Sequence, residues 1–291
     1  MAHGTLTVRG TTFVWGARTY VMGILNLTPD SFSGDGLLAD AVTDPLPAIV
    51  AQARRMADEG ADLLDLGGES TRPGHAPVDD AQELGRVVPA MRAVRAALPA
   101  MPLSIDTTKL AVARVALDEG ADLLNDVGAV APGGAPLARL AGERGVPLIV
   151  MHGRAAPRYA DVVAEVVADL RAALARAMDL GVPATHLIVD PGFGFGKTAG
   201  HNLRLLRELA ALQALERPIL LGTSRKSTIG RVLDLPAEER LEGTLATTAL
   251  GIAAGVDIVR VHDVRANVRA ARMADAIVRG SALEDEEATH P

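Results

Sequence analysis

The chain has 291 residues, of which 48% are hydrophobic and 2% aromatic, with no cysteine and a formal net charge of -7 at pH 7. The acidic balance argues against a general binder of nucleic acid or anionic membranes, and the scarcity of aromatic rings leaves no platform for stacking single-stranded bases. Without cysteine there is no disulfide, thiolate metal site or thiolate nucleophile, which fits a reducing compartment. No apolar run approaches the roughly 18 to 20 residues of a membrane span and no secretory pattern opens the chain, so we expect a cytoplasmic protein.

The segment 5–20 comes first and alternates apolar and polar residues around Arg9-Gly10 and Gly16. This pattern predicts a small hairpin that caps the bottom of the domain. Next, a unit reading ADEGADLLDLGGES at 57–70 recurs as DEGADLLNDVG at 118–128 and more loosely as AAGVDIVRVHD at 253–263. Each copy has a helix end, a glycine suited to a left-handed C-cap, an apolar run and polar residues where the run stops.

A strand that is apolar almost throughout is covered on both faces, as in a parallel sheet with helices outside. Six such strands are predicted at 21–27, 63–66, 147–151, 186–189, 218–222 and 258–261, and two shorter ones begin at Leu103 and Leu123. Eight strands with helices between them predict a (β/α)8 TIM barrel, an α/β fold that occupies one domain of about 250 residues. We therefore expect one domain over 1–280, with the hairpin in 1–20 and a disordered acidic tail over 281–291.

Polar residues follow the predicted strands at the end where such barrels carry their chemistry. Asp106 ends the third strand, Asn125 the fourth and Asp190 the sixth. Each alone could be an ordinary helix N-cap or loop residue. The run after Asp190 reads PGFGFGK, in which alternating glycines allow close backbone approach to a ligand, but it is not a dinucleotide fingerprint.

Cations and hydroxyls gather after the last two strands, where barrels frequently bind phosphate. Lys226 and Ser227 follow the seventh strand, while Arg260 lies within the eighth and His262 at its end. Only three of the 29 basic residues are lysines, and all three lie near predicted strand ends. Arg260 interrupts an apolar strand, where an unpaired charge is costly, so we expect it to meet a phosphate.

Two carboxylates, an amide and a lysine suit a flat heterocycle that presents N–H donors and a carbonyl acceptor, while the Arg260 and His262 pair suits a phosphorylated arm. No Ser/His/Asp triad is evident, so the chemistry must come from binding and electrostatics. Seven motifs, in order MGILNLTPDSFS, LDLGGESTRPG, SIDTTK, LNDV, DPGFGFGK, TSRKS and RVHDV, span about 20–274. Together they resemble the signatures of the dihydropteroate synthase family, whose members are pterin-binding TIM barrels.

The resemblance implies a transferase of folate biosynthesis. Its reaction condenses 7,8-dihydropterin-6-ylmethyl pyrophosphate with 4-aminobenzoate and yields 7,8-dihydropteroate and pyrophosphate. It also implies a homodimer, because the family is usually dimeric. Carried over by position, the pterin residues are Asp106, Asn125, Asp190 and Lys226. Asp106 and Lys226 among them would be the catalytic pair.

The same resemblance assigns the remaining subsites. Asn26 would bind Mg2+, which neutralises the leaving pyrophosphate. The residues for pyrophosphate would be Arg72, Arg260 and His262. Those for 4-aminobenzoate would be Thr71, Pro73, Phe195 and Ser227.

The sequence departs from the family pattern in three places. Asp35 is displaced by one position, since SFSGDG stands where many members have SFSDGG; the segment GRAAPRY after His152 is short; and Gly128 replaces a frequent Ser or Thr. Two alternatives remain open. A non-catalytic pterin-binding paralogue would lack the ordered loops, and a folate-dependent methyltransferase domain would not need the TSRKS and RVHDV phosphate groups.

Overall fold

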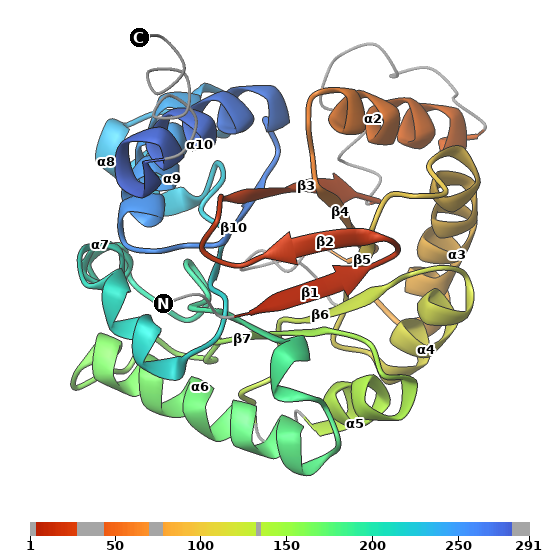
Figure 1. The fold of residues 1–291 in the computed structure, drawn as a ribbon, viewed down its shortest axis with the longest axis horizontal. Helices are drawn as coiled ribbons and strands as arrows, with labels where there is room; N and C mark the ends of the chain where they lie inside the picture. The colour runs from red at the N-terminus through yellow and green to blue at the C-terminus, as the bar shows by residue number, and fades with distance from the viewer. Residues whose placement is uncertain (1–3, 28–43, 70–77, 132–134, 281–291) are drawn as a thin grey trace, which may run out of the picture.

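The computed structural model describes residues 4–27, 44–69, 78–131 and 135–280. Eight parallel strands form one sheet in the order β8-β7-β6-β5-β4-β3-β10-β9, and a bridge between Val189 and Ile219 joins its two edges. Figure 1 looks along the resulting barrel, with helices around it. The strands are β3 (Tyr20–Asn26), β4 (Leu63–Gly67), β5 (Leu103–Asp106), β6 (Leu123–Asp126), β7 (Leu148–Met151), β8 (Leu187–Asp190), β9 (Leu220–Leu221) and β10 (Ile258–Val261). The predicted TIM barrel is confirmed.

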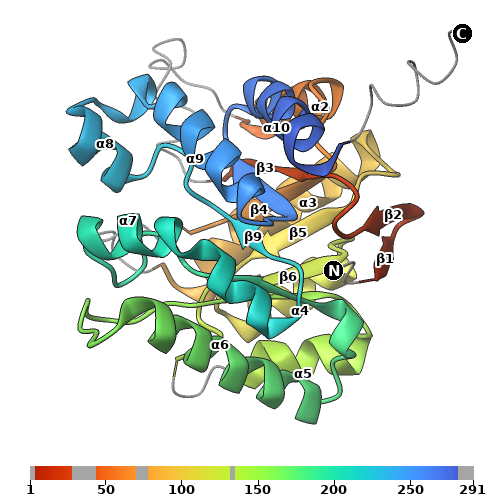
Figure 2. The same ribbon diagram turned by 60° about the vertical axis from the view of Figure 1, so that its left-hand side comes forward.

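The helices form the outer ring of the barrel, as Figures 1 and 2 show. Several begin at residues whose side chains cap free backbone N–H groups, among them Asp79, Asp161 and Thr198. In the described part of the chain, no helix has the length and apolar character needed to cross a membrane. The helices are α2 (Leu46–Asp58), α3 (Asp80–Ala97), α4 (Leu110–Asp118), α5 (Ala135–Arg144), α6 (Val162–Asp179), α7 (Ala199–Arg207), α8 (Ser227–Leu233), α9 (Leu241–Ala253) and α10 (Val264–Arg279).

Three strands begin later than predicted, and in two of them the predicted first residue is a proline; the other bounds differ by one residue at most. The strands predicted to begin at Pro147 and Pro218 begin instead at Leu148 and Leu220. Each proline accepts a ladder hydrogen bond through its carbonyl oxygen, but it has no N–H to donate to the neighbouring strand. His186, predicted to open a strand, belongs to a short 3-10 helix, Ala184–His186.

The predicted N-terminal hairpin is also confirmed. Strands β1 (Thr5–Val8) and β2 (Thr11–Val14) pair antiparallel, and both turn residues, Arg9 and Gly10, have positive φ as two-residue hairpin turns require. The hairpin lies across the near end of the barrel in Figure 1.

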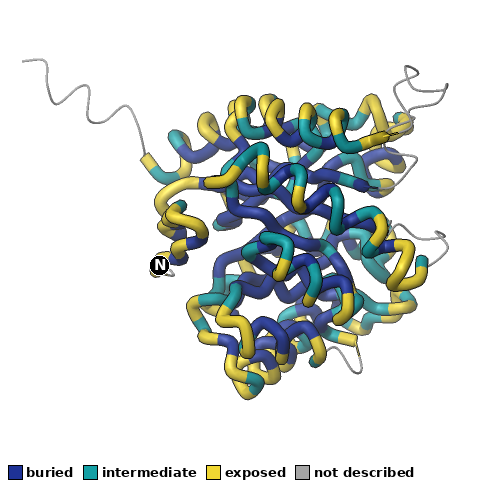
Figure 3. The backbone as a smooth tube through the Cα atoms, turned by 90° about the vertical axis from the view of Figure 1, so that its right-hand side faces the viewer, coloured by how far each residue is buried: buried dark blue, intermediate teal, exposed yellow. Residues whose placement is uncertain are grey.

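An aromatic cluster beneath the hairpin closes the bottom of the barrel. The Phe13, Trp15 and Tyr20 rings have centroids 4.8 to 5.7 Å apart. They pack with Leu6, Val8 and inward-facing strand residues, namely Met22, Leu63, Leu123, Ile149, Ile188, Leu220 and Ile258. A second, larger core of Ala, Val and Leu side chains fills the space between strands and helices. Figure 3 shows the buried backbone concentrated in the interior.

We predict that the aromatic cluster at the bottom of the barrel is a main source of stability. Trp15 is 1% exposed, so Trp15→Ala removes a large buried ring and should lower the free energy of unfolding by about 3 to 5 kcal/mol. Val14, its neighbour, is 41% exposed, and Val14→Ala should change that free energy by no more than about 0.5 kcal/mol. Urea denaturation measures both, and equal losses would contradict the assignment.

Candidate functional site

Strand pairing places several predicted site residues in one row at the C-terminal edge of the barrel. In the register of the sheet, Asn26 of β3 is opposite Gly67, Gly67 is opposite Asp106 of β5, and Asp106 is opposite Asn125 of β6. Neighbouring strands lie about 5 Å apart, so the three polar residues belong to one surface. The barrel therefore brings together residues that are far apart in the sequence.

A buried ionic network joins this row to β10. Arg260 donates from Nε to Asp65 Oδ2 at 2.6 Å and from Nη2 to Asp106 Oδ2 at 2.8 Å. Asp65 Oδ2 also accepts from Asn125 Nδ2 at 3.1 Å. Asp65 is fully buried, with 0% of its side chain exposed, so this hydrogen-bonded pairing stabilises a charge that would otherwise be very costly.

Asp65 is the main residue that sequence analysis missed. It interrupts the apolar run LLDLG of β4, as Arg260 interrupts IVRV of β10. The two interruptions have opposite charge, which was the available signal. Arg260 does not need a phosphate to compensate its charge, because two carboxylates of the chain itself pair with it. Its contact with pyrophosphate stays a prediction.

The charges in the network shift one another's pKa. Burial raises the pKa of Asp106; Arg260 opposes this shift, and Asp65 adds to it. For Arg260 burial is the largest influence and lowers the pKa, but Asp65 and Asp106 outweigh it, and the net shift is upward. Arg260 is therefore a permanent cation, while Asp106 holds its negative charge less firmly than an ordinary aspartate.

Each acidic or amide member of this network also keeps one oxygen for another partner. Oδ1 of Asp65, Asp106 and Asn125 is buried and accepts no hydrogen bond within the described part of the chain. The amide orientation of Asn125 follows from its Nδ2 bond to Asp65, which leaves Oδ1 as an acceptor. Buried acceptors without partners are uncommon and fit a ligand that presents N–H groups.

Asp190 and Lys226 form the opposite side of the site. Burial raises the pKa of Asp190, against the attraction of Lys226, and its Oδ1 accepts from Gly192 N at 2.7 Å. Lys226 Nζ donates to Phe193 O at 2.5 Å and lies 4.7 Å from the Phe195 ring centroid. Burial lowers the pKa of Lys226 to about 8, and Asp190 and Asp106 limit that shift. A cation of this kind can donate a hydrogen bond to a ligand carbonyl.

The end of β10 and the loop after β9 are linked through His262. Ser224 Oγ lies 2.9 Å from His262 Nδ1 and accepts from the His262 backbone N at 3.1 Å. Arg225 forms a two-point ion pair with Asp263, with distances of 2.5 and 3.0 Å. Ser227, the first residue of α8, is exposed beside them.

Some predicted site residues lie outside the described residues, namely Asp35, Thr71, Arg72 and Pro73. Among the described residues, no group of three or more His, Asp or Glu side chains could hold a metal ion. Asn26 is partly buried at the end of β3 and offers a hard oxygen donor. Mg2+ commonly takes only one or two protein ligands and keeps waters or phosphate oxygens, so Asn26 is compatible with such an ion.

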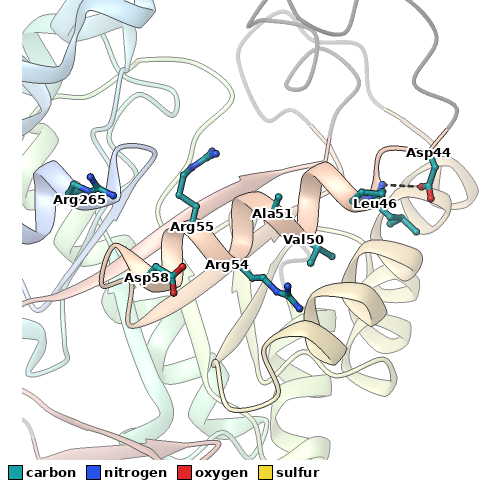
Figure 4. A pocket seen from close by; sticks show the side chains of 9 residues that line it. Asp44, Leu46, Val50, Ala51, Arg54, Arg55, Asp58 and Arg265 are labelled. Carbon is teal, nitrogen blue, oxygen red and sulfur yellow. Dashed lines mark hydrogen bonds between the residues drawn. The ribbon is translucent and has the colours of Figure 1, made fainter.

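A hollow of about 750 Å3 lies away from this site, on the outer side of α2. Figure 4 shows Arg54, Arg55 and Asp58 of α2 along it, with Arg265 of α10 nearby. Its walls come from outer helices and the segment before α2, and none of the strand-end residues lines it. It is therefore separate from the candidate site.

We predict that Asp65 keeps the pKa of Asp106 high. Asp65→Asn preserves the shape but removes one negative charge and frees Arg260 to act on Asp106 alone, so the pKa of Asp106 should fall. Carbon-13 NMR of labelled aspartate carboxyls measures it. The control is Asp118→Asn, since Asp118 is 53% exposed and pairs with Arg144 at the surface. An unchanged Asp106 titration in Asp65→Asn would contradict the network.

Comparison with known proteins gives the family. The family model for pterin binding enzymes matches residues 22–262. The dihydropteroate synthase of Clostridium beijerinckii is 46% identical over 265 residues, which cover 91% of this chain and 96% of that protein. The Xanthomonas albilineans dihydropteroate synthase structure with 4-aminobenzoic acid has a TM-score of 0.86 and 41% identity, covering 94% of this chain and 97% of that one. Its structure with 7,8-dihydropteroate has a TM-score of 0.84 and 39% identity, with 94% and 98% covered. The chain therefore belongs to the dihydropteroate synthases, within the family of pterin-binding enzymes.

Proposed function

We propose that the chain condenses 7,8-dihydropterin-6-ylmethyl pyrophosphate with 4-aminobenzoate, forming 7,8-dihydropteroate and pyrophosphate for folate biosynthesis. The observation that carries the proposal is the set of buried acceptors, Oδ1 of Asp106 and of Asn125, beside the Arg260 network. A reduced pterin presents ring N–H groups that suit these oxygens. Relatives of known activity supply the reaction, and the strand-end residues supply a site with matching polarity.

In this proposal the pterin lies between the two halves of the site. Asp106 and Asn125 accept from its ring N–H groups on one side. Asp190 accepts on the other side, and Lys226 donates to the ring carbonyl. Asp106, Asn125 and Asp190 belong to barrel strands, which fix their separation before any ligand arrives, while Lys226 lies at the start of α8 and is held by Phe193 O.

The pyrophosphate extends toward His262 and Arg260, with Arg72 from the segment outside the described residues. Asn26 would hold Mg2+, whose positive charge neutralises the developing charge on the leaving group. The 4-aminobenzoate lies against Phe195, with Ser227 and with Thr71 or Pro73. The Phe195 ring beside Lys226 Nζ supports this part, because it offers an apolar face next to a cation.

The chemistry follows from charge placement. The bond between the pterin methylene carbon and the pyrophosphate oxygen breaks first, and its electrons leave with pyrophosphate. The Asp106 carboxylate stabilises the resulting pterin-methyl cation electrostatically. The amine nitrogen of 4-aminobenzoate then bonds to that carbon and releases one proton to solvent.

The test is turnover by the purified protein. The parent should release pyrophosphate only when both substrates and Mg2+ are present, and a chelator should stop it. Asp106→Asn keeps the size of the side chain but removes the charge facing the cation, so turnover should fall by about 100-fold or more. The exposed-site control Asp118→Asn should match the parent. Pterin binding without any turnover in the parent would favour the non-catalytic paralogue, and full activity in Asp106→Asn would refute its catalytic role.

We further propose a homodimer formed by the outer faces of α9 and α10. Leu250 of α9 is 65% exposed, and Met273 and Ile277 of α10 are 63% and 71% exposed. The two helices lie side by side in Figures 1 and 2, and we expect their exposed apolar side chains to lie on one face. Exposed apolar patches of this kind commonly mark protein contacts. We also propose a cytoplasmic location, which the absence of cysteine supports.

The homodimer proposal predicts a change of mass in solution. The parent should sediment at twice the 30.2 kDa chain mass. Placing charge on the patch with Leu250→Glu and Ile277→Glu together should give monomers at micromolar concentration, because burying unpaired carboxylates is costly. The control Val14→Glu changes an exposed residue of the hairpin and should remain dimeric. A monomeric parent would refute this proposal without touching the catalytic one.

A further inference from the structure

Lys197 is a partly buried cation to which the proposed chemistry gives no role. It ends the glycine-rich segment 191–197 and donates from Nζ to Gly192 O at 2.9 Å and to Phe195 O at 3.2 Å. A third contact at 2.9 Å joins Nζ to His152 Nδ1. A longer contact, at 3.4 Å, reaches His152 O. An ammonium group has three N–H donors, and the three shorter contacts match them.

His152 has the tautomer that this contact needs. Its Nε2 lies 3.0 Å from Asp169 Oδ2, which also accepts from the Arg154 guanidinium at 2.7 Å. An ionised carboxylate accepts only, so Nε2 carries the proton and Nδ1 is left as an acceptor. Burial and the charge of Lys197 lower the pKa of His152 to about 4, in keeping with a neutral imidazole.

The glycine-rich segment lies directly on the chain after β7. Gly192 and Gly196 have φ of +65° and +60°, and a Cβ on them would come within 1.6 Å of His152 O and 2.0 Å of Arg154 O. No other residue fits there without moving backbone. On its other side the segment is held by Gly194 N, which donates to Asn202 Oδ1 at 2.9 Å.

The position of this segment sets the surroundings of Lys226. Phe193 O accepts from Lys226 Nζ at 2.5 Å, and the Phe195 ring lies 4.7 Å from that atom. Lys197 therefore binds the carbonyl oxygens of Gly192 and Phe195, which lie on either side of Phe193 in the sequence. Phe193 is the residue whose carbonyl oxygen binds Lys226. A shift of the segment would move the Lys226 ammonium and the Phe195 ring together.

We propose that Lys197, held by His152, is a positioning residue that fixes segment 192–196 and thereby the Phe195 face and the Lys226 ammonium for 4-aminobenzoate. The inference rests on the proposed function. The 4-aminobenzoate side of the site depends on segment 192–196, whereas Asp106, Asn125 and Asp190 on the pterin side are held by their own strands. Loss of Lys197 should therefore harm the use of 4-aminobenzoate much more than the binding of pterin.

The first test is Lys197→Met, which keeps an unbranched apolar chain and removes the three donors. Assays run at pH 6.5, because burial lowers the pKa of Lys197 to about 7, with Asp190 opposing. The kcat/KM for 4-aminobenzoate should fall by about 10- to 100-fold, the range expected of a small misplacement. The Kd of 6-hydroxymethylpterin, measured by calorimetry, should rise by no more than about fivefold, since only its Lys226 contact is weakened while Asp106, Asn125 and Asp190 stay on their strands.

The second test uses two substitutions at His152 that each keep one nitrogen's role. The Asn amide reaches the position of Nδ1, so His152→Asn keeps an acceptor for Lys197 and loses the hydrogen bond to Asp169. The Gln amide reaches the position of Nε2, so His152→Gln keeps the hydrogen bond to Asp169 and loses the side-chain acceptor for Lys197. We expect His152→Gln to behave like Lys197→Met and His152→Asn to retain most of the parent kcat/KM.

Thermal unfolding of each variant separates positioning from stability. His152 is fully buried, so the smaller Asn side chain should lower the melting temperature more than Gln does. If activity followed stability, His152→Asn would be the worse enzyme, and the inference would be overturned. A parental kcat/KM in both Lys197→Met and His152→Gln would also overturn it. Absence of turnover in the parent would refute the proposed function instead.

Discussion

The site depends on one interaction, the pairing of Arg260 with Asp65 and Asp106 in the interior of the barrel mouth. Arg260 and Asp65 are 195 positions apart in the sequence, yet their side chains meet at 2.6 Å. This pairing compensates buried charges, and Asp65 also orients Asn125 through a hydrogen bond. Asp106 keeps one oxygen free for a ligand. Charged groups held in this way need no reorganisation when charge develops in a reaction, which is the basis of electrostatic catalysis.

Much of the fold could be predicted because its elements are local in sequence. The repeated unit contains a helix end, a left-handed glycine and an apolar strand, and Gly60, Gly120 and Gly255 of its three copies all have the positive φ that such C-caps use. Strand bounds failed at Pro147 and Pro218 because apolar character does not reveal which residues can donate a ladder hydrogen bond. The row of Asn26, Asp106 and Asn125 was predictable, since parallel strands end at a common edge.

Side-chain pairing inside the barrel was not predictable in the same way. Periodicity shows that Asp65 and Arg260 lie in apolar strands, but only the closure of the barrel brings β4 and β10 to either side of β3. Arg260 was therefore expected to meet a phosphate, and its two internal carboxylate partners were not foreseen. Lys197 is one of only three lysines, but its proposed role depends on His152, which lies 45 positions earlier. His152 follows β7 and Lys197 follows β8, so only the pairing of these strands brings them together.

The two ends of the barrel have opposite energetic roles. At the bottom, aromatic rings and apolar strand residues are buried without charge, and this burial stabilises the fold. At the mouth, burial raises the pKa of Asp106 and Asp190 above that of an unfolded aspartate. Raised carboxyl pKa values contribute stability that is present below the unfolded pKa and lost as pH rises through the folded pKa. At neutral pH these two acids therefore oppose folding, and buried acids with raised pKa values of this kind are typical of functional sites.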